Sequence, residues 1–155
     1  MTCKAENIKV SREKYDSYDS ALWEKNYFDD DTGGYLVIEK IRIKQSEKSK
    51  NEGEKFLKEY EMCITLAKAG YTVEYLESKP NSYDIHLNGI KADLKKTAGH
   101  NNMAHYAKKA VKKQGADMVV FEFEIMTGKI HEELNKLKIL GIKIKYFASE
   151  NIKAI

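Results

Sequence analysis

Two aspartates and a lysine flank a pair of residues that marks a tight turn. The pair is Asn88-Gly89, with Asp84 on one side and Asp93 and Lys95 on the other. Asn-Gly between two alternating segments predicts a two-residue hairpin loop, because a type I′ turn needs two positive φ angles. Counting outward from the loop places Asp84 opposite Asp93, with Lys95 two residues further along the same strand face. The pattern therefore predicts two opposed carboxylates with an ammonium beside them.

Two opposed carboxylates favour a bound divalent cation between them. Like charges directly across a strand pair oppose folding unless something neutralises them. Mg²⁺ takes one or two protein carboxylates and keeps its other sites for water and phosphate, so Mg²⁺ is the expected cofactor, with Mn²⁺ and Zn²⁺ as alternatives. Lys95 would then hold a nucleophilic water or neutralise charge on a phosphate. The alternative is a plain solvated sheet face on which Lys91 and Lys95 offset the aspartates.

A third acidic residue is expected from a helix. The helix predicted over residues 51–69 places Glu59 on its apolar face, three, four and seven residues before Met62, Cys63 and Leu66. Acidic side chains are rarely buried without a partner. Glu59 is therefore a candidate third metal ligand, unless it lies at the edge of the stripe and reaches water. Glu61 and, less favourably, Glu54 are the alternatives for this role.

A basic stretch follows the predicted hairpin. Residues 94–116 contain six lysines, two histidines and no acid. Without acids, the i,i+4 ion pairs that stabilise exposed helices cannot form, which favours a phosphate-binding surface over a solvated helix face. The candidate nucleic-acid contacts are Lys96, His105, Lys108, Lys109, Lys112 and Lys113. His100 and His105 could instead be general acids of a metal-free ribonuclease.

Alternating and helical patterns predict the elements that position these residues. Helices are expected over 51–69, 102–114 and 130–140, and strands over 71–77, 83–87, 90–95, 117–125 and 142–147. Residues 34–44 look like a further extended segment, and 45–54 like a linker or an irregular helix start. The order α-β-β-β-α-β-α-β predicts an α/β (α+β) fold with a central mixed sheet of about five strands flanked by helices.

Length and composition indicate one globular domain. The chain has 155 residues, of which 42% are hydrophobic and 33% charged, with a net charge of +3. No window resembles a membrane span or a signal peptide, so the chain as given is expected to be cytoplasmic and without a membrane partner. Cys63 is expected in the core and Cys3 is incidental. We assign residues 51–155 to the domain that carries the candidate site and treat 1–50 as an N-terminal extension with no assigned role.

The arrangement of Glu59, Asp84, Asp93 and Lys95 resembles the PD-(D/E)XK nuclease superfamily, although Tyr83 stands where the motif has proline. The resemblance implies a restriction-endonuclease-like core and a metal-dependent phosphodiester hydrolase. Over residues 33–124 the chain resembles the C-terminal nuclease domains of contact-dependent inhibition toxins and related phage-associated and polymorphic toxins. Many of these cleave tRNA, which favours RNA over DNA as the partner.

The toxin resemblance also implies an immunity protein as partner and delivery from a larger secreted toxin or phage protein. In such domains a polar residue on the helix after the triplet assists the site, and Gln114 corresponds to it here. Gln114 could equally be a residue near the helix end with no role. Two other functions stay open: a non-catalytic nucleic-acid-binding module, and an accessory domain of a phage or mobile element whose carboxylates are incidental.

Overall fold

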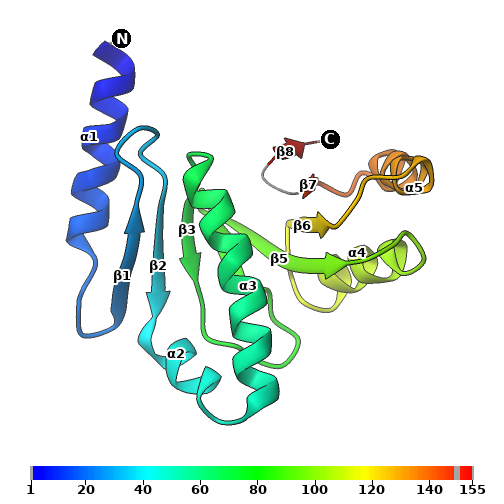
Figure 1. The fold of residues 1–155 in the computed structure, drawn as a ribbon, viewed down its shortest axis with the longest axis horizontal. Helices are drawn as coiled ribbons and strands as arrows, with labels where there is room; N and C mark the ends of the chain where they lie inside the picture. Colours follow the sequence, from blue (N-terminus) through cyan, green and yellow to red (C-terminus); the bar gives the residue numbers. More distant parts are fainter. Residues whose placement is uncertain (1, 149–150, 155) are drawn as a thin grey trace. The chain divides into compact units, whose positions relative to one another are not determined.

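The computed structural model describes residues 2–148 and 151–154. The chain divides into two compact units, one formed by Met1–Ser78 with Ile85–Gly89 and the other by Lys79–Asp84 with Ile90–Ile155. Both units consist of strands flanked by helices (Figure 1). The predicted α/β class, with a mixed sheet and flanking helices, is confirmed, but the described residues form eight strands where about five were predicted.

The first unit contains three helices and four strands. In chain order they are α1 (Thr2–Ser17), β1 (Trp23–Phe28), β2 (Tyr35–Glu39), α2 (Lys40–Ser46), α3 (Lys50–Lys68), β3 (Thr72–Tyr75) and β4 (Ile85–Leu87). The strands lie in the order β1-β2-β3-β4. The β1–β2 and β3–β4 pairs are antiparallel, and β2 and β3 are parallel.

The register of this sheet separates an apolar face from a mixed one. Leu36 pairs with Val73, which pairs with Leu87, and all three are buried. Helix α3 packs against this face (Figure 1). Tyr35 and Val37 point to the opposite face, where Tyr15 of α1 packs against them. Glu74 of β3 and His86 of β4, which are paired with each other, lie on the same mixed face.

Residues 1–50 hold more structure than their sequence pattern predicts. Helix α1 has few apolar positions, and aromatic contacts of Tyr15 with Phe28 and Tyr35 hold it to the sheet. The prediction of one extended segment over 34–44 is wrong in its second half, where α2 begins at Lys40. The alternation of isoleucines around Arg42 suggests a strand, but Arg42 is the buried residue of this short helix.

Helix α3 matches its prediction closely. Ser49 is its N-cap, accepting a hydrogen bond from the Glu52 N–H, and Gly70 follows its end with a φ of 102°. Its buried residues include Glu59, as expected for an acid on the apolar face, and Cys63, which is fully buried in the core. Among the helices of the described residues, none is long and apolar enough to cross a membrane.

The second unit contains β5 (Ile90–Thr97), α4 (Met103–Lys112), β6 (Met118–Phe123), α5 (Gly128–Ile139), β7 (Ile144–Ala148) and β8 (Asn151–Ala154). Strands β5, β6 and β7 are parallel neighbours, and β8 pairs antiparallel with β7. Strand β8 was not predicted.

Helices α4 and α5 pack on one face of this sheet. Their buried side chains, including Met103, Ala107, Ile130 and Leu134, form one core cluster with Val119, Phe121 and Phe123 of β6. Residues paired across parallel strands point to the same face. Asp93 pairs with Val119 and Lys95 with Phe121, so both site residues lie on the face that the helices cover. This placement explains how a strand carboxylate comes to be buried.

Candidate functional site

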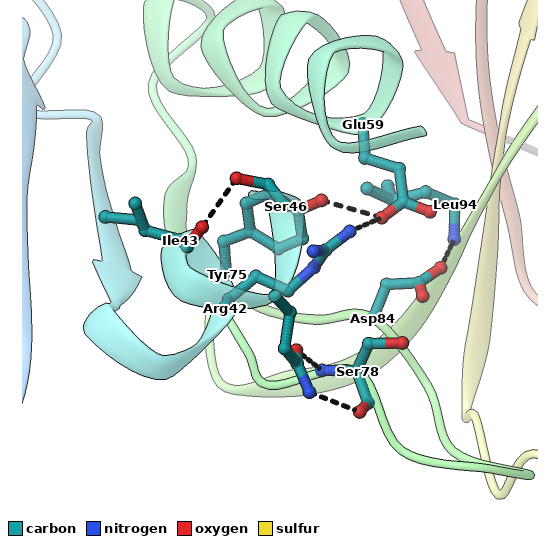
Figure 2. Close-up of polar contacts among 9 residues, drawn as sticks. Arg42, Ile43, Ser46, Glu59, Tyr75, Ser78, Asp84 and Leu94 are labelled. Atoms are coloured by element: carbon teal, nitrogen blue, oxygen red, sulfur yellow. Dashed lines mark hydrogen bonds and ion pairs between the residues drawn. The ribbon is translucent and has the colours of Figure 1, made fainter. Parts of the chain in front are cut away.

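The predicted turn at Asn88-Gly89 is confirmed, with φ angles of 49° and 81°. The predicted register beyond it is not regular. With Asp84 opposite Asp93, the Asp84 N–H would point away from β5, yet it donates to Ala92 O at 3.1 Å. The Asp84 carboxylate in turn accepts the Leu94 N–H at 2.8 Å (Figure 2). Asp84 therefore forms hydrogen bonds with both neighbours of Asp93, Ala92 and Leu94. Its carboxylate takes the place of the strand carbonyl that would otherwise accept the Leu94 N–H.

Asp93 is a fully buried carboxylate, with 0% of its surface exposed. The Lys95 ammonium lies 3.2 Å from Asp93 Oδ2, but neither carboxylate oxygen accepts a hydrogen bond. Lys95 is 25% exposed and also lies 5.7 Å from the centre of the Tyr106 ring on α4. Because an ionised carboxylate has about four acceptor positions, Asp93 retains unused acceptor capacity in a place that water hardly reaches.

These donors fit a hard divalent cation. Oxygen ligands are the ones that Mg²⁺ and Mn²⁺ prefer, and a buried carboxylate without a hydrogen-bond donor is costly unless it serves a purpose. Within the described residues, no three His, Cys, Asp or Glu side chains are grouped as a metal cage. A complete cage is not required, because Mg²⁺ commonly takes only one or two protein carboxylates.

Glu59 lies in the first unit, together with its two partners, Tyr75 and Arg42 (Figure 2). It is 9% exposed, accepts a hydrogen bond of 2.7 Å from the Tyr75 hydroxyl, and lies 3.5 Å from Arg42 Nη2. Burial first, and then the charge of Glu59 and its hydrogen bond, raise the pKa of Tyr75 far above its usual value, so the phenol stays protonated. Glu59 is thus a buried, charge-paired carboxylate, and its role as a metal ligand stays a prediction.

Arg42 is the partner that the sequence did not reveal. Its guanidinium lies beside the stacked rings of Phe56 and Tyr75, 5.3 and 5.2 Å from their centres, and the residue is 1% exposed. Neither Nη atom makes a hydrogen bond, so the contact with Glu59 is electrostatic. The only signal in the sequence is a lone arginine between Ile41 and Ile43, which an alternating pattern assigns to a solvated strand face.

The predicted nucleic-acid contacts separate into two groups. Lys96 forms a 2.9 Å ion pair with Glu122 of β6, so its charge is already compensated. The others share one surface hollow of about 210 Å³ on α4, which we call the basic hollow; it is lined by His105, Lys108, Lys109, Lys112 and Lys113. All five of these side chains are exposed. The basic hollow therefore has the character of a phosphate-binding surface.

Three remaining polar residues have different surroundings. Gln114 follows the end of α4, and its side-chain oxygen is buried without a hydrogen-bond partner. The side-chain oxygen of Gln114 is therefore buried and has unused hydrogen-bond acceptor capacity, as the Asp93 carboxylate has. His100 lies in the turn before α4 and is partly exposed. His86, which the sequence places near the aspartates, pairs through Nδ1 with Glu74 at 2.8 Å in the first unit.

Comparison with known proteins identifies a similar fold. The sequence matches no family model, and no curated protein matches it. A chain of a CdiA-CT/CdiI toxin and immunity complex from Burkholderia pseudomallei has a similar structure, with a TM-score of 0.55 and 23% sequence identity. The match covers 70% of this chain and 89% of the other. At this identity the comparison shows a shared fold.

Proposed function

We propose that this protein is a metal-dependent nuclease of the PD-(D/E)XK type, centred on Asp84, Asp93 and Lys95. The observation that carries the proposal is the buried Asp93 carboxylate, which lies 3.2 Å from the Lys95 ammonium and accepts no hydrogen bond. Structural ion pairs in proteins normally satisfy their oxygens. A carboxylate that keeps acceptor capacity on both oxygens beside an ion pair is better explained by a cation that binds there.

Each residue has a role that its surroundings support. Asp84 and Asp93 would hold the cation, and the Leu94 N–H fixes the orientation of the Asp84 carboxylate. A bound cation of this kind would acidify a coordinated water and polarise the phosphodiester. Lys95 is partly exposed and can reach either a water or a phosphate oxygen, where its charge offsets the negative charge that develops during attack. Gln114 is a candidate to orient a water or a phosphate through its unpaired oxygen.

The basic hollow supports a nucleic acid as substrate. Its four lysines and one histidine stand without an interleaved acid on α4, the helix that follows the strand of Asp93 and Lys95. Such a surface contacts the phosphate backbone and positions a strand without reading its bases. RNA, and tRNA in particular, is favoured over DNA by the likeness to toxin domains. The solved complex also supports an immunity protein as partner of a toxin role.

A cleavage assay tests the proposal. The full chain is incubated with total tRNA and, separately, with plasmid DNA in Mg²⁺, Mn²⁺ or EDTA, beside Asp93→Ala and Lys95→Ala. Cleavage that requires the cation and is lost in both variants is the expected result. Activity that survives EDTA and Asp93→Ala would exclude a metal nuclease and direct attention to His100 and His105. Tight binding without cleavage under every condition would instead identify a non-catalytic binding module.

A further inference from the structure

A cavity of about 500 Å³ lies on the mixed face of the first unit. Helix α1 forms one wall through Asn7, Val10, Ser11 and Lys14, and the sheet side is formed by Tyr18, Tyr35, Thr72, Glu74, His86 and Gly89. The residues proposed for catalysis do not line it. This volume suits a small organic ligand, since such sites typically occupy roughly 300–1,000 Å³.

A connected set of polar side chains lies at the sheet side of this cavity. Glu74 accepts hydrogen bonds from the Tyr18 hydroxyl at 2.6 Å and pairs with His86 Nδ1 at 2.8 Å. The hydroxyls of Tyr18 and Tyr35 are 3.0 Å apart. Burial, followed by the hydrogen bond to Glu74, raises the pKa of Tyr18 far above its usual value. Tyr18 therefore stays a donor, and Glu74 is held in a fixed orientation.

Glu74 keeps acceptor capacity toward the cavity. Each of its oxygens contacts one of these two side chains, Oε2 the Tyr18 hydroxyl and Oε1 the His86 ring, while an ionised carboxylate can accept about four hydrogen bonds. The side chain is 26% exposed. A planar ligand with a pair of adjacent N–H donors would match a carboxylate fixed in this way. Among the nucleobases, guanine offers such a pair on its Watson–Crick edge, whereas adenine, cytosine and uracil each offer a single donor group there.

The rest of the lining suits the other parts of a nucleotide. Val10 is 64% exposed although it is apolar, so it presents a surface against which a base can pack. The ammonium of Lys14 lies 5.3 Å from the centre of the Tyr18 ring and is exposed, within reach of a phosphate. Aromatic side chains are the usual stacking partners of unstacked bases.

We propose that this cavity binds a guanine nucleotide, with Glu74 accepting the Watson–Crick N–H donors of the base and Lys14 binding its phosphate. The ligand can be a free nucleotide or an unpaired guanosine of a single strand, since both present the same groups. The proposal goes beyond the nuclease activity and does not depend on it, because binding at this cavity needs neither a metal nor cleavage.

Equilibrium binding to the full chain in EDTA tests the inference. Trp23, the single tryptophan, lies 5.3 Å from the Tyr18 ring, so its fluorescence reports on the cavity. We expect 5′-GMP to bind saturably and at least about tenfold more tightly than AMP, CMP or UMP, because the competitors leave an acceptor unpaired. Absence of saturable binding, equal affinity for all four nucleotides, or equal competition by ribose 5-phosphate would overturn the proposal.

Variants locate the ligand. Glu74→Gln should weaken GMP binding at least about tenfold, because an acceptor for the base is lost, whereas Glu24→Gln, an exposed residue outside the lining, should not. Lys14→Gln should weaken binding of GMP but not of guanosine, with Lys9→Gln as its control. Val10→Asp removes the apolar surface for the base and adds a charge that repels the phosphate, without touching the polar set. It should weaken GMP binding, and it tests the site even if Glu74→Gln does not fold. GMP affinity unchanged in Val10→Asp would refute the assignment.

Two further measurements distinguish a free nucleotide from a nucleic-acid strand as the ligand, and the nucleotide-binding proposal from the nuclease proposal. A short single strand with one central guanosine, compared with the same strand carrying adenosine, shows whether an internal nucleotide also binds. Asp93→Ala should keep full GMP affinity. A protein that binds GMP but cleaves nothing would keep this inference and lose the nuclease proposal, and one that cleaves without GMP binding would do the reverse.

Discussion

The Lys95 ammonium lies 3.2 Å from Asp93 Oδ2, and yet neither oxygen of Asp93 accepts a hydrogen bond. An ion pair formed for stability would align an N–H with a carboxylate oxygen, since the charge-assisted hydrogen bond adds to the attraction. Here the carboxylate is fully buried while the lysine keeps contact with solvent. The Asp93 carboxylate therefore keeps acceptor positions that Lys95 does not fill.

Removal of the Asp93 carboxylate should abolish cleavage without loss of stability. Asp93→Ala eliminates a poorly compensated buried charge, so we expect the melting temperature to stay equal or to rise by a few degrees, on the order of the shift produced by about 1 kcal/mol. Asp117→Ala, at an exposed position, is the control and should retain activity. A melting temperature lowered by more than about 5 °C in Asp93→Ala would show that the carboxylate is structural.

Arg42 and Glu59 should depend strongly on each other. Arg42→Met leaves a buried carboxylate without its cation and should cost about 3–5 kcal/mol in the free energy of unfolding. The double variant Arg42→Met, Glu59→Met should recover most of this loss, because both charges are then absent. A denaturant-unfolding cycle of the two single variants and the double variant measures the coupling, and additive single effects would contradict the ion pair.

Tyr75→Phe isolates the hydrogen bond to Glu59 from the ion pair. The substitution keeps the ring that packs against Arg42 and Phe56 and removes only the donor of the 2.7 Å hydrogen bond. We expect a loss of about 1–3 kcal/mol, the usual cost of leaving a buried acceptor unsatisfied. Tyr60→Phe, whose hydroxyl bonds the exposed Asn26, is the matched control and should cost much less.

Asp29 should make stability depend on acid pH. Burial tends to raise its pKa, but the Tyr27 hydroxyl and the N–H groups of Thr32 and Asp31 together hold the pKa below its usual value. A lowered folded-state pKa stabilises the fold above the unfolded value of about 3.9, and this contribution is lost as pH falls through the folded value. The melting-temperature difference from Asp29→Asn should therefore shrink from pH 6 toward about pH 2. Asp30→Asn, at an exposed neighbour, should show no such trend.

The basic hollow should act through charge alone. Lys109→Gln and Lys113→Gln should each weaken nucleic-acid binding similarly for all sequences, and each should reduce the slope of log affinity against log salt by about 0.7–0.9. Lys129→Gln, on α5 and outside the hollow, should leave the slope unchanged. Filter binding or fluorescence anisotropy at several salt concentrations gives the slopes. A sequence-dependent loss of affinity would show base contacts instead.

Much of the fold follows from local patterns, because local patterns determine helix ends and turns. Helix α3 and the Asn88-Gly89 turn are where the sequence predicts them, since capping and positive φ angles involve only near neighbours. Helix α1 could not be predicted in this way, because its attachment depends on Tyr15 meeting Phe28 and Tyr35 of other elements.

The candidate site was predictable in its residue types and less so in its geometry. The burial of Glu59 follows from its place among apolar residues, but its partner Arg42 lies on a short helix whose isoleucines alternate like those of a strand. The register at Asp84 departs from the regular one because its N–H and its carboxylate both form hydrogen bonds with β5. Counting residues outward from the turn cannot predict these contacts, since it assumes a regular ladder.

The path of the chain through the two units has a consequence for protein synthesis. The chain leaves the first unit after Ser78, returns to it for Ile85–Gly89, and then leaves again. Until residue 89 emerges from the ribosome, the nascent first unit lacks β4, and the edge of β3 that pairs with it stays open. Neither unit corresponds to an uninterrupted stretch of the gene, so a stop codon near residue 78 should yield an aggregation-prone fragment rather than a folded one.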